Sequence, residues 1–138
     1  MCSSDLRGLG GVVLFRRNLS DPQQIRHLCS DIRAAAAGLP PPIVGVDEEG
    51  GKVQRLRAFT RPIPPMREVG IVGPEAARAV GREIGRALRE FGFNLDFAPV
   101  LDVDSNPDNP IIEDRAFGAG PAQVAAAALA RRRTPGHR

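Results

Sequence analysis

The chain has 138 residues, enough for one domain with a buried core, and its 42% hydrophobic and 25% charged residues are typical of an ordinary globular protein. Its apolar runs are too short to cross a membrane, and its first residues lack the apolar segment of a signal peptide. The two cysteines, Cys2 and Cys29, form no disulfide framework, so we expect a cytoplasmic protein without a membrane partner.

The net charge of +3 comes from the end of the chain, where four of the last eight residues are arginine. Without them, 15 basic residues stand against 16 acidic ones, so the body of the protein is almost neutral. The chain also contains no Trp or Tyr. Nucleic-acid-binding surfaces combine a clustered basic face with aromatic side chains, so we do not expect a nucleic-acid partner.

The first third of the chain predicts a strand, a helix and a second strand. The apolar run 11–15 is the first strand, and Ser20-Asp21-Pro22 offers an N-cap and a first-turn proline for a helix. The apolar face of that helix recurs at helical spacing and consists of Ile25, Leu28, Cys29, Ile32 and Ala36. The segment 38–42, Gly-Leu-Pro-Pro-Pro, ends the helix and leads into a buried strand that finishes at Asp47.

The remaining sequence predicts a loop over 52–73, a helix from Pro74 to Gly92, a strand over 94–102 and a last helix after Pro121. The apolar stripe of the longer helix is Ala76, Val80, Ile84 and Leu88, and two glycines, Gly81 and Gly85, allow close packing. Alternating strands and helices predict an α/β fold with a parallel sheet. Three such units are either half of a doubly wound sheet or part of a (β/α)8 barrel, which needs roughly 250 residues to close.

Polar side chains follow the predicted strands at their carboxyl ends, where parallel α/β folds place their chemistry. Asp47 begins a run of three acids that ends at Gly50-Gly51, the third strand ends at Asp102, and a later loop carries Arg115. A carboxylate and a guanidinium facing each other suit a hydroxyl-rich or anionic ligand. The alternative is that Asp47 and Arg115 form a structural ion pair.

Two further motifs are candidate binding sites. Asp102, Asp104, Asn106 and Glu113 stand at positions 1, 3, 5 and 12 of a calcium loop, but Pro107 takes the place of the required glycine. Gly50-Gly51-Lys52 matches neither nucleotide-binding glycine pattern. We therefore expect no metal and no cofactor, and no role for His27 or His137 beyond the surface.

Three motifs resemble glycoside hydrolase family 3: Val-Asp-Glu-Glu-Gly-Gly-Lys-Val-Gln-Arg at 46–55, Phe-Ala-Pro-Val-Leu-Asp-Val at 97–103, and 105–117. The first is similar to the single-domain β-N-acetylhexosaminidases of bacterial peptidoglycan recycling. The resemblance implies a (β/α)8 barrel and retaining hydrolysis of terminal N-acetylglucosamine glycosides. It also implies that Asp47 and Arg115 bind the sugar, whereas Glu48, Glu49, Lys52 and Arg55 support the loop.

The resemblance covers about residues 8–130, so we interpret 1–7 as a non-native leader, 8–130 as a partial barrel and 131–138 as an aberrant basic tail. The family's aspartate nucleophile and its Asp-His acid/base pair have no counterpart here. The chain is therefore expected to be a fragment with no catalytic residue and no activity of its own. A stand-alone sugar-binding or regulatory module and a family 3 β-glucosidase fragment are the alternatives, and an α/β nucleotide-binding domain lacks a phosphate loop.

Overall fold

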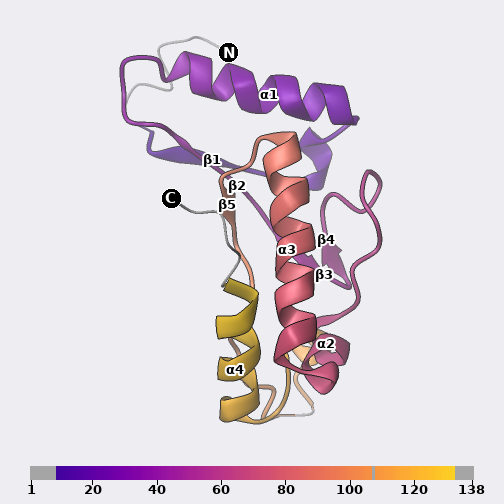
Figure 1. Ribbon diagram of the computed structural model, residues 1–138. Helices are drawn as coiled ribbons and strands as arrows, with labels where there is room; N and C mark the ends of the chain where they lie inside the picture. Colours follow the sequence, from indigo (N-terminus) through magenta and orange to yellow (C-terminus); the bar gives the residue numbers. More distant parts are fainter. Residues whose placement is uncertain (1–8, 107, 133–138) are drawn as a thin grey trace.

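The computed structural model describes residues 9–106 and 108–132, and Figure 1 shows the arrangement of their helices and strands. Three parallel strands form one sheet in the order β1-β2-β5. They are β1 (Gly11–Leu14), β2 (Ile43–Val46) and β5 (Leu95–Asp96). Directly after β2, the strands β3 (Glu48–Gly50) and β4 (Val53–Gln54) form a separate antiparallel hairpin.

The α-helices of the described residues are α1 (Pro22–Ala35), α2 (Met66–Val72), α3 (Pro74–Phe91) and α4 (Pro121–Arg132). The 3-10 turns η1 (Arg16–Asn18) and η2 (Glu113–Arg115) follow β1 and precede α4. In Figure 1, α1 lies across one end of the molecule, and α3 and α4 run side by side, in agreement with their contacts. Each parallel strand is thus separated from the next by at least one helix, as the sequence predicts.

The ends of the two longest helices follow the expected chemistry. The Asp21 carboxylate accepts hydrogen bonds from the backbone N–H groups of Gln23 and Gln24, both at 2.9 Å, and Pro22 occupies the first turn of α1. Helix α3 ends at Gly92, whose φ of +91° is the left-handed conformation that favours glycine. Both helix boundaries agree with the sequence analysis.

The helices cover only one face of the parallel sheet. In β2, Val44 and Val46 are completely buried, whereas Ile43 is 47% exposed, and Val13 of β1, which pairs with Gly45, is 39% exposed. Side chains alternate between the two faces of a strand. Continued beyond Val46, the last residue of β2, this alternation places Asp47 on the uncovered face and Glu48 on the face that the helices cover.

Three boundaries differ from the predictions. Only Leu95–Asp96 of the segment 94–102 is a strand, because Pro99 has no N–H to donate and the bonding to β2 ends when Phe97 N donates to Val46 O. The loop predicted over 52–73 contains β4 and α2, whose short apolar pattern the prolines before it conceal. Helix α4 continues to Arg132, so the boundary drawn after Ala130 falls inside a helix.

The predicted leader, 1–7, and the rest of the predicted basic tail, 133–138, lie outside the described residues. Within α3, the buried side is slightly rotated from the predicted stripe. Ile84 and Leu88 are buried as expected, whereas Ala76 and Val80 are half-buried and the buried positions nearby are Ala77 and Gly81.

Only one of the two glycines predicted to allow close packing lies at a close contact. A Cβ at Gly81 would stand 2.4 Å from the Arg131 carbonyl oxygen of α4, whereas a Cβ at Gly85 would meet only the Arg89 guanidinium, at 3.6 Å. Gly81 therefore sets the distance between α3 and α4, and Gly85 does not.

We expect Gly81→Ala to lower the free energy of unfolding by about 1–3 kcal/mol, because the added methyl group forces α3 and α4 apart. Gly85→Ala is the matched control and should raise it by up to about 1 kcal/mol, because alanine is the better helix former. Urea unfolding followed by circular dichroism measures both values. Equal effects of the two substitutions would contradict a close contact at Gly81.

Candidate functional site

The three acids after β2 have three different environments, and the first of them faces an arginine. One oxygen of Asp47 lies 3.3 Å from Arg55 Nη2, and both side chains are partly exposed. Among the described residues, the other carboxylate oxygen of Asp47 has no hydrogen-bond partner. Asp47 is thus oriented from one side by Arg55 and has an oxygen left with which to accept hydrogen bonds from a ligand.

Glu49, two residues further on, holds Arg115 in a bidentate pair. Arg115 Nε and Nη2 donate to the two oxygens of Glu49 at 2.9 and 2.8 Å, and Nη1 donates to the Ile111 carbonyl at 3.1 Å. The Glu49 side chain is only 6% exposed. A guanidinium has five N–H groups, so two of those on Arg115 stay available to a ligand.

Electrostatics keep Arg115 positively charged. Its hydrogen bonds to Glu49 raise the pKa of Arg115 further above its ordinary value, and the nearby charges of Asp102 and Asp47 act in the same direction. These carboxylates therefore surround the guanidinium, as expected for groups at the carboxyl ends of neighbouring strands. Arg115 is accordingly a fixed cation with its position set mainly by Glu49.

Glu48, between Asp47 and Glu49 in the chain, points into the protein. Its side chain is almost completely buried, and one carboxylate oxygen accepts the Leu56 N–H at 2.9 Å. Burial raises the pKa of Glu48, while the hydrogen bonds from the backbone of Leu56 and Arg55 oppose that rise. Glu48 therefore ties the β3–β4 hairpin to the segment that follows it.

These contacts test one of the two interpretations of Asp47 and Arg115, the structural ion pair between them. The structural ion pair between them is wrong, because Arg55 is the partner of Asp47 and Glu49 is the partner of Arg115. The loop-supporting role expected for the neighbours of Asp47 agrees with the contacts of Glu48, Glu49 and Arg55. Lys52 has the same role, since it pairs with Glu113 and lies 3.5 Å from Asp114.

The calcium pattern does not assemble into a site. Asp104 pairs with Arg67, and Glu113 pairs with Lys52, so two of its four positions are used in ion pairs. Among the described residues, no group of three or more His, Cys, Asp or Glu side chains could hold a metal ion. The pattern therefore reflects a polar loop, while Pro107 lies outside the described residues.

Sequence reasoning missed Asp96, which ends β5 next to the Asp47 loop. One of its oxygens accepts the Glu48 N–H at 2.9 Å, and the other lies 3.6 Å from Arg131 Nη2. Burial raises the pKa of Asp96 to about 7, against the Glu48 N–H and the charge of Arg131, which lower it. The sequence signal for Asp96 is that it directly follows an apolar strand residue, Leu95. The prediction of a strand as far as Asp102 concealed this signal, because it placed Asp96 inside the strand.

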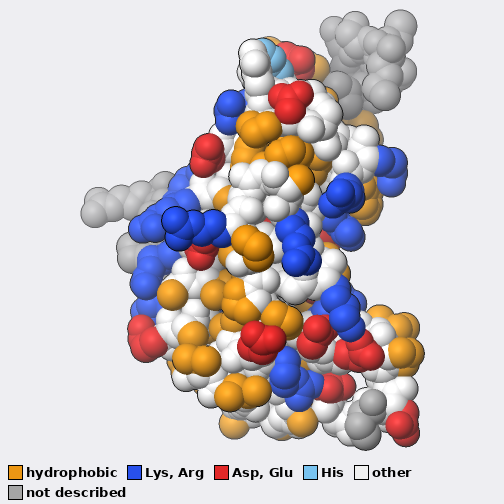
Figure 2. All heavy atoms as spheres, turned by 90° about the vertical axis from the view of Figure 1, so that its right-hand side faces the viewer, with side chains coloured by type: hydrophobic (Ala, Val, Ile, Leu, Met, Phe, Trp, Pro, Cys, Tyr) orange, Lys and Arg blue, Asp and Glu red, His pale blue; other side chains and the backbone are white. Residues whose placement is uncertain are grey.

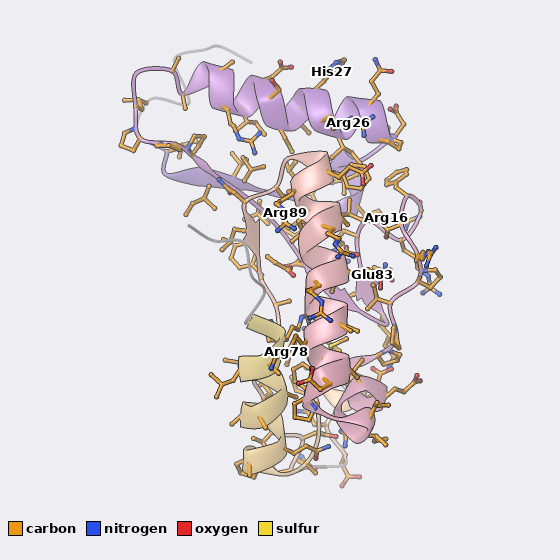
Figure 3. All side chains as sticks on the ribbon, viewed as in Figure 1. Arg16, Arg26, His27, Arg78, Glu83 and Arg89 are labelled. Atoms are coloured by element: carbon orange, nitrogen blue, oxygen red, sulfur yellow. The ribbon has the colours of Figure 1, made fainter. Side chains whose placement is uncertain are left out.

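The remaining surface does not add to this site. His27 is exposed on α1, and Figure 3 shows it pointing away from the other elements, as expected of a surface residue. Figure 2 shows basic and acidic side chains interspersed over one face. No helix of the described residues is long and apolar enough to cross a membrane.

Comparison with known proteins identifies the family. The model of the glycosyl hydrolase family 3 N-terminal domain matches residues 5–133. The chain belongs to this family. Its resemblance to family 3 in the sequence and its partial α/β barrel fold are thereby confirmed.

The curated relatives of this family 3 chain carry the name of an enzyme, β-hexosaminidase. It is 45% identical over 137 residues to the β-hexosaminidase of Thiobacillus denitrificans, and 44% identical over 125 residues to that of Nitrosospira multiformis. These alignments cover 90% and 85% of the chain but only 37% and 35% of the relatives. The chain thus spans little more than a third of the length of these curated relatives.

Solved structures of family 3 share the fold. The β-N-acetylglucosaminidase from Paenibacillus sp. str. FPU-7 superposes with a TM-score of 0.86 at 36% identity, over 90% of this chain and 24% of that one. NagZ from Neisseria gonorrhoeae superposes with a TM-score of 0.85 at 35% identity, over 94% of this chain and 40% of that one. One structure of NagZ is a complex with N-trifluoroacetyl-D-glucosamine.

For the family 3 chain, we expect Glu49→Gln to lower the free energy of unfolding by about 1.5–3 kcal/mol, because a charged bidentate pair is lost at a buried position. Glu113→Gln is the matched control, since Glu113 and its partner Lys52 are both largely exposed. It should change the value by less than about 1 kcal/mol. Chemical unfolding measures both, and equal losses would contradict the special role of Glu49.

The raised pKa of Asp96 predicts a pH dependence of stability. Asp96 binds its proton more tightly in the folded chain, with a pKa of about 7 against 3.8 ordinarily, so its contribution to stability falls as pH rises through this interval. Asp96→Asn should remove that part of the slope between about pH 4 and pH 7. Unfolding midpoints measured across this range test it, with Asp31→Asn, which removes an exposed carboxylate on α1, as the matched control.

Proposed function

We propose that this chain forms part of the sugar-binding subsite of a β-N-acetylhexosaminidase and that Asp47 and Arg115 are its ligand-binding residues. The observation that carries the proposal is the arrangement of the two side chains. Each is held by a partner, Arg55 or Glu49, and each keeps hydrogen-bonding capacity beyond that partner. A carboxylate that accepts and a guanidinium that donates are suited to neighbouring hydroxyl groups of one sugar.

The names of the relatives support the choice of substrate. They are called β-hexosaminidases or β-N-acetylglucosaminidase, and N-trifluoroacetyl-D-glucosamine binds NagZ of Neisseria gonorrhoeae. We therefore assign terminal N-acetylglucosamine glycosides as the substrate class, in preference to the glucosides of a β-glucosidase. Peptidoglycan recycling in the cytoplasm is the setting we propose for this reaction.

In this proposal, the chain binds and orients the sugar and supplies no group that breaks the bond. A retaining glycosidase needs a general acid/base and a nucleophile, with about 5–5.5 Å between their carboxyl groups where both are carboxylates. Asp47 and Glu49 are each paired with a guanidinium, and their carboxylate oxygens serve as hydrogen-bond acceptors. Their part in catalysis would be to fix the sugar so that its anomeric carbon is correctly placed.

We expect the chain to bind methyl N-acetyl-β-D-glucosaminide weakly and saturably, and Asp47→Asn to weaken this binding roughly tenfold, because a charged acceptor becomes neutral. Titration followed by ¹H–¹⁵N NMR measures the affinity. Asp31→Asn, which removes an exposed carboxylate on α1, should bind like the wild type. Absence of saturable binding in the wild type, or equal binding by Asp47→Asn, would contradict the proposal.

The purified 138-residue chain should show no turnover of an aryl N-acetyl-β-D-glucosaminide. Hydrolysis that Asp47→Ala abolishes would show that the chain does hold groups that break the bond. Binding without turnover is also what a stand-alone sugar-binding module predicts, and a sugar-dependent change in the affinity for another protein would favour that alternative.

A further inference from the structure

Arg131 is a buried arginine that the proposed sugar contacts do not explain. It lies near the end of α4, is 5% exposed, and reaches from that helix to the segment after β2. Its Nη1 donates to the Glu49 carbonyl at 3.2 Å, and its Nη2 donates to the Glu48 carbonyl at 3.0 Å. One guanidinium thus holds two consecutive carbonyl groups of the strand that carries the candidate site.

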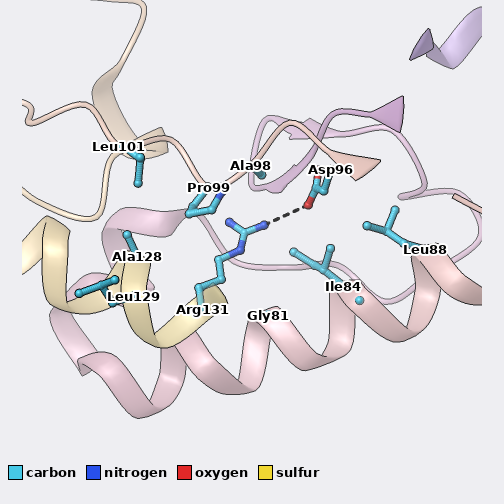
Figure 4. Close-up of a pocket in the computed structure, with 11 residues that line it drawn as sticks. Gly81, Ile84, Leu88, Asp96, Ala98, Pro99, Leu101, Ala128, Leu129 and Arg131 are labelled. Carbon is cyan, nitrogen blue, oxygen red and sulfur yellow. Dashed lines mark ion pairs between the residues drawn. The ribbon is translucent and has the colours of Figure 1, made fainter. Parts of the chain in front are cut away.

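Asp96 contacts the same segment from the sheet. It accepts the Glu48 N–H at 2.9 Å and lies 3.6 Å from Arg131 Nη2, and Figure 4 shows this ion pair at the wall of a cavity of about 410 Å³. Glu48 is therefore held through its N–H by β5 and through its C=O by α4. Neither Asp47 nor Arg115 lines the cavity.

The opposite charges around this pair stabilise one another. Burial lowers the pKa of Arg131, while the carboxylates of Asp96, Glu49 and Glu48 raise it. Three charged groups act on Asp96: Arg131 of α4 lowers its pKa, and Glu48 of β3 and the adjacent Asp47 raise it. A buried charge is costly unless it is paired and hydrogen-bonded, and Arg131 meets both conditions only while the segment 48–49 stays in place.

The geometry points to Arg131 and Asp96 as positioning residues that fix the backbone of Glu48 and Glu49 and thereby set Arg115 and Asp47 for the sugar. The connection is direct in the chain. Glu49 offers its carbonyl to Arg131 and its carboxylate to Arg115, so a displaced Glu49 backbone displaces the Arg115 guanidinium. Asp47 is the residue immediately before Glu48. The sugar-binding part of this inference rests on the proposed function.

The test compares Arg131→Lys with Arg89→Lys, an equivalent change at an exposed arginine of α3. Lysine keeps the charge but lacks the planar fork that reaches two carbonyls. We expect Arg131→Lys to shift the ¹H–¹⁵N signals of Glu48 and Glu49, to lose the exchange-protected Arg115 Nε–H signal, and to weaken binding of methyl N-acetyl-β-D-glucosaminide roughly tenfold. Arg89→Lys should leave all three unchanged.

Asp96→Asn is the second variant, and it preserves the packing because asparagine and aspartate have nearly the same size. In the wild type, the Glu48 amide shift should titrate with a midpoint near 7, the pKa of its acceptor Asp96. In Asp96→Asn, which can still accept that N–H, this titration should disappear, and the Arg115 Nε–H signal should weaken. This variant decides the question if Arg131→Lys fails to fold.

The outcomes separate this inference from the proposed function. If the signals of Glu48, Glu49 and Arg115 stay at their wild-type positions in both variants, the positioning role is wrong whatever the sugar does. If those signals change and the wild type binds no sugar, the positioning role holds and the proposed function fails. If the signals change and sugar affinity does not, Arg131 and Asp96 are structural residues, and the inference is overturned.

Discussion

Two buried glutamates directly after a buried strand are the constraint on which the rest of the structure depends. Glu48 and Glu49 are each less than 5% exposed, although a carboxylate is rarely buried without a partner. The Leu56 N–H is a partner of the Glu48 carboxylate and the Arg115 guanidinium is a partner of the Glu49 carboxylate, while Arg131 and Asp96 bind the backbone of the same two residues. Four separate parts of the chain therefore converge on two residues.

This convergence separates the supporting contacts from Asp47 and Arg115, the two groups proposed to bind a ligand. The alternation of β2 directs Glu48 toward the helices and Asp47 toward the uncovered face of the sheet. The side chain of Asp47 pairs with Arg55, only eight residues further along the chain, so this contact is local. Arg115 reaches the site through a pair that spans 66 residues, so its position depends on the tertiary fold.

The sequence was sufficient for features that depend on local chemistry. The Asp21 cap, the left-handed Gly92 and the supporting role of Glu49 follow from side chains and backbone near them or from the resemblance to family 3. The partners of Asp47 and Arg115 could not be predicted this way, because the chain contains many arginines and the tertiary fold decides which carboxylate each one meets. Asp96 and Arg131 were missed for another reason. One was placed inside a longer strand, and the other was assigned to a basic tail.

A buried arginine near the end of a helix has a physical consequence for specificity. Replacing such a network by apolar residues is often neutral or even stabilising, so its stability alone does not explain why charges stand there. What apolar side chains cannot do is fix the direction of two carbonyl groups and one N–H at the same time. In this chain those three groups belong to Glu48 and Glu49. The charged network therefore determines where the acidic segment lies, and the uncovered face of the sheet inherits that precision through Asp47 and Arg115.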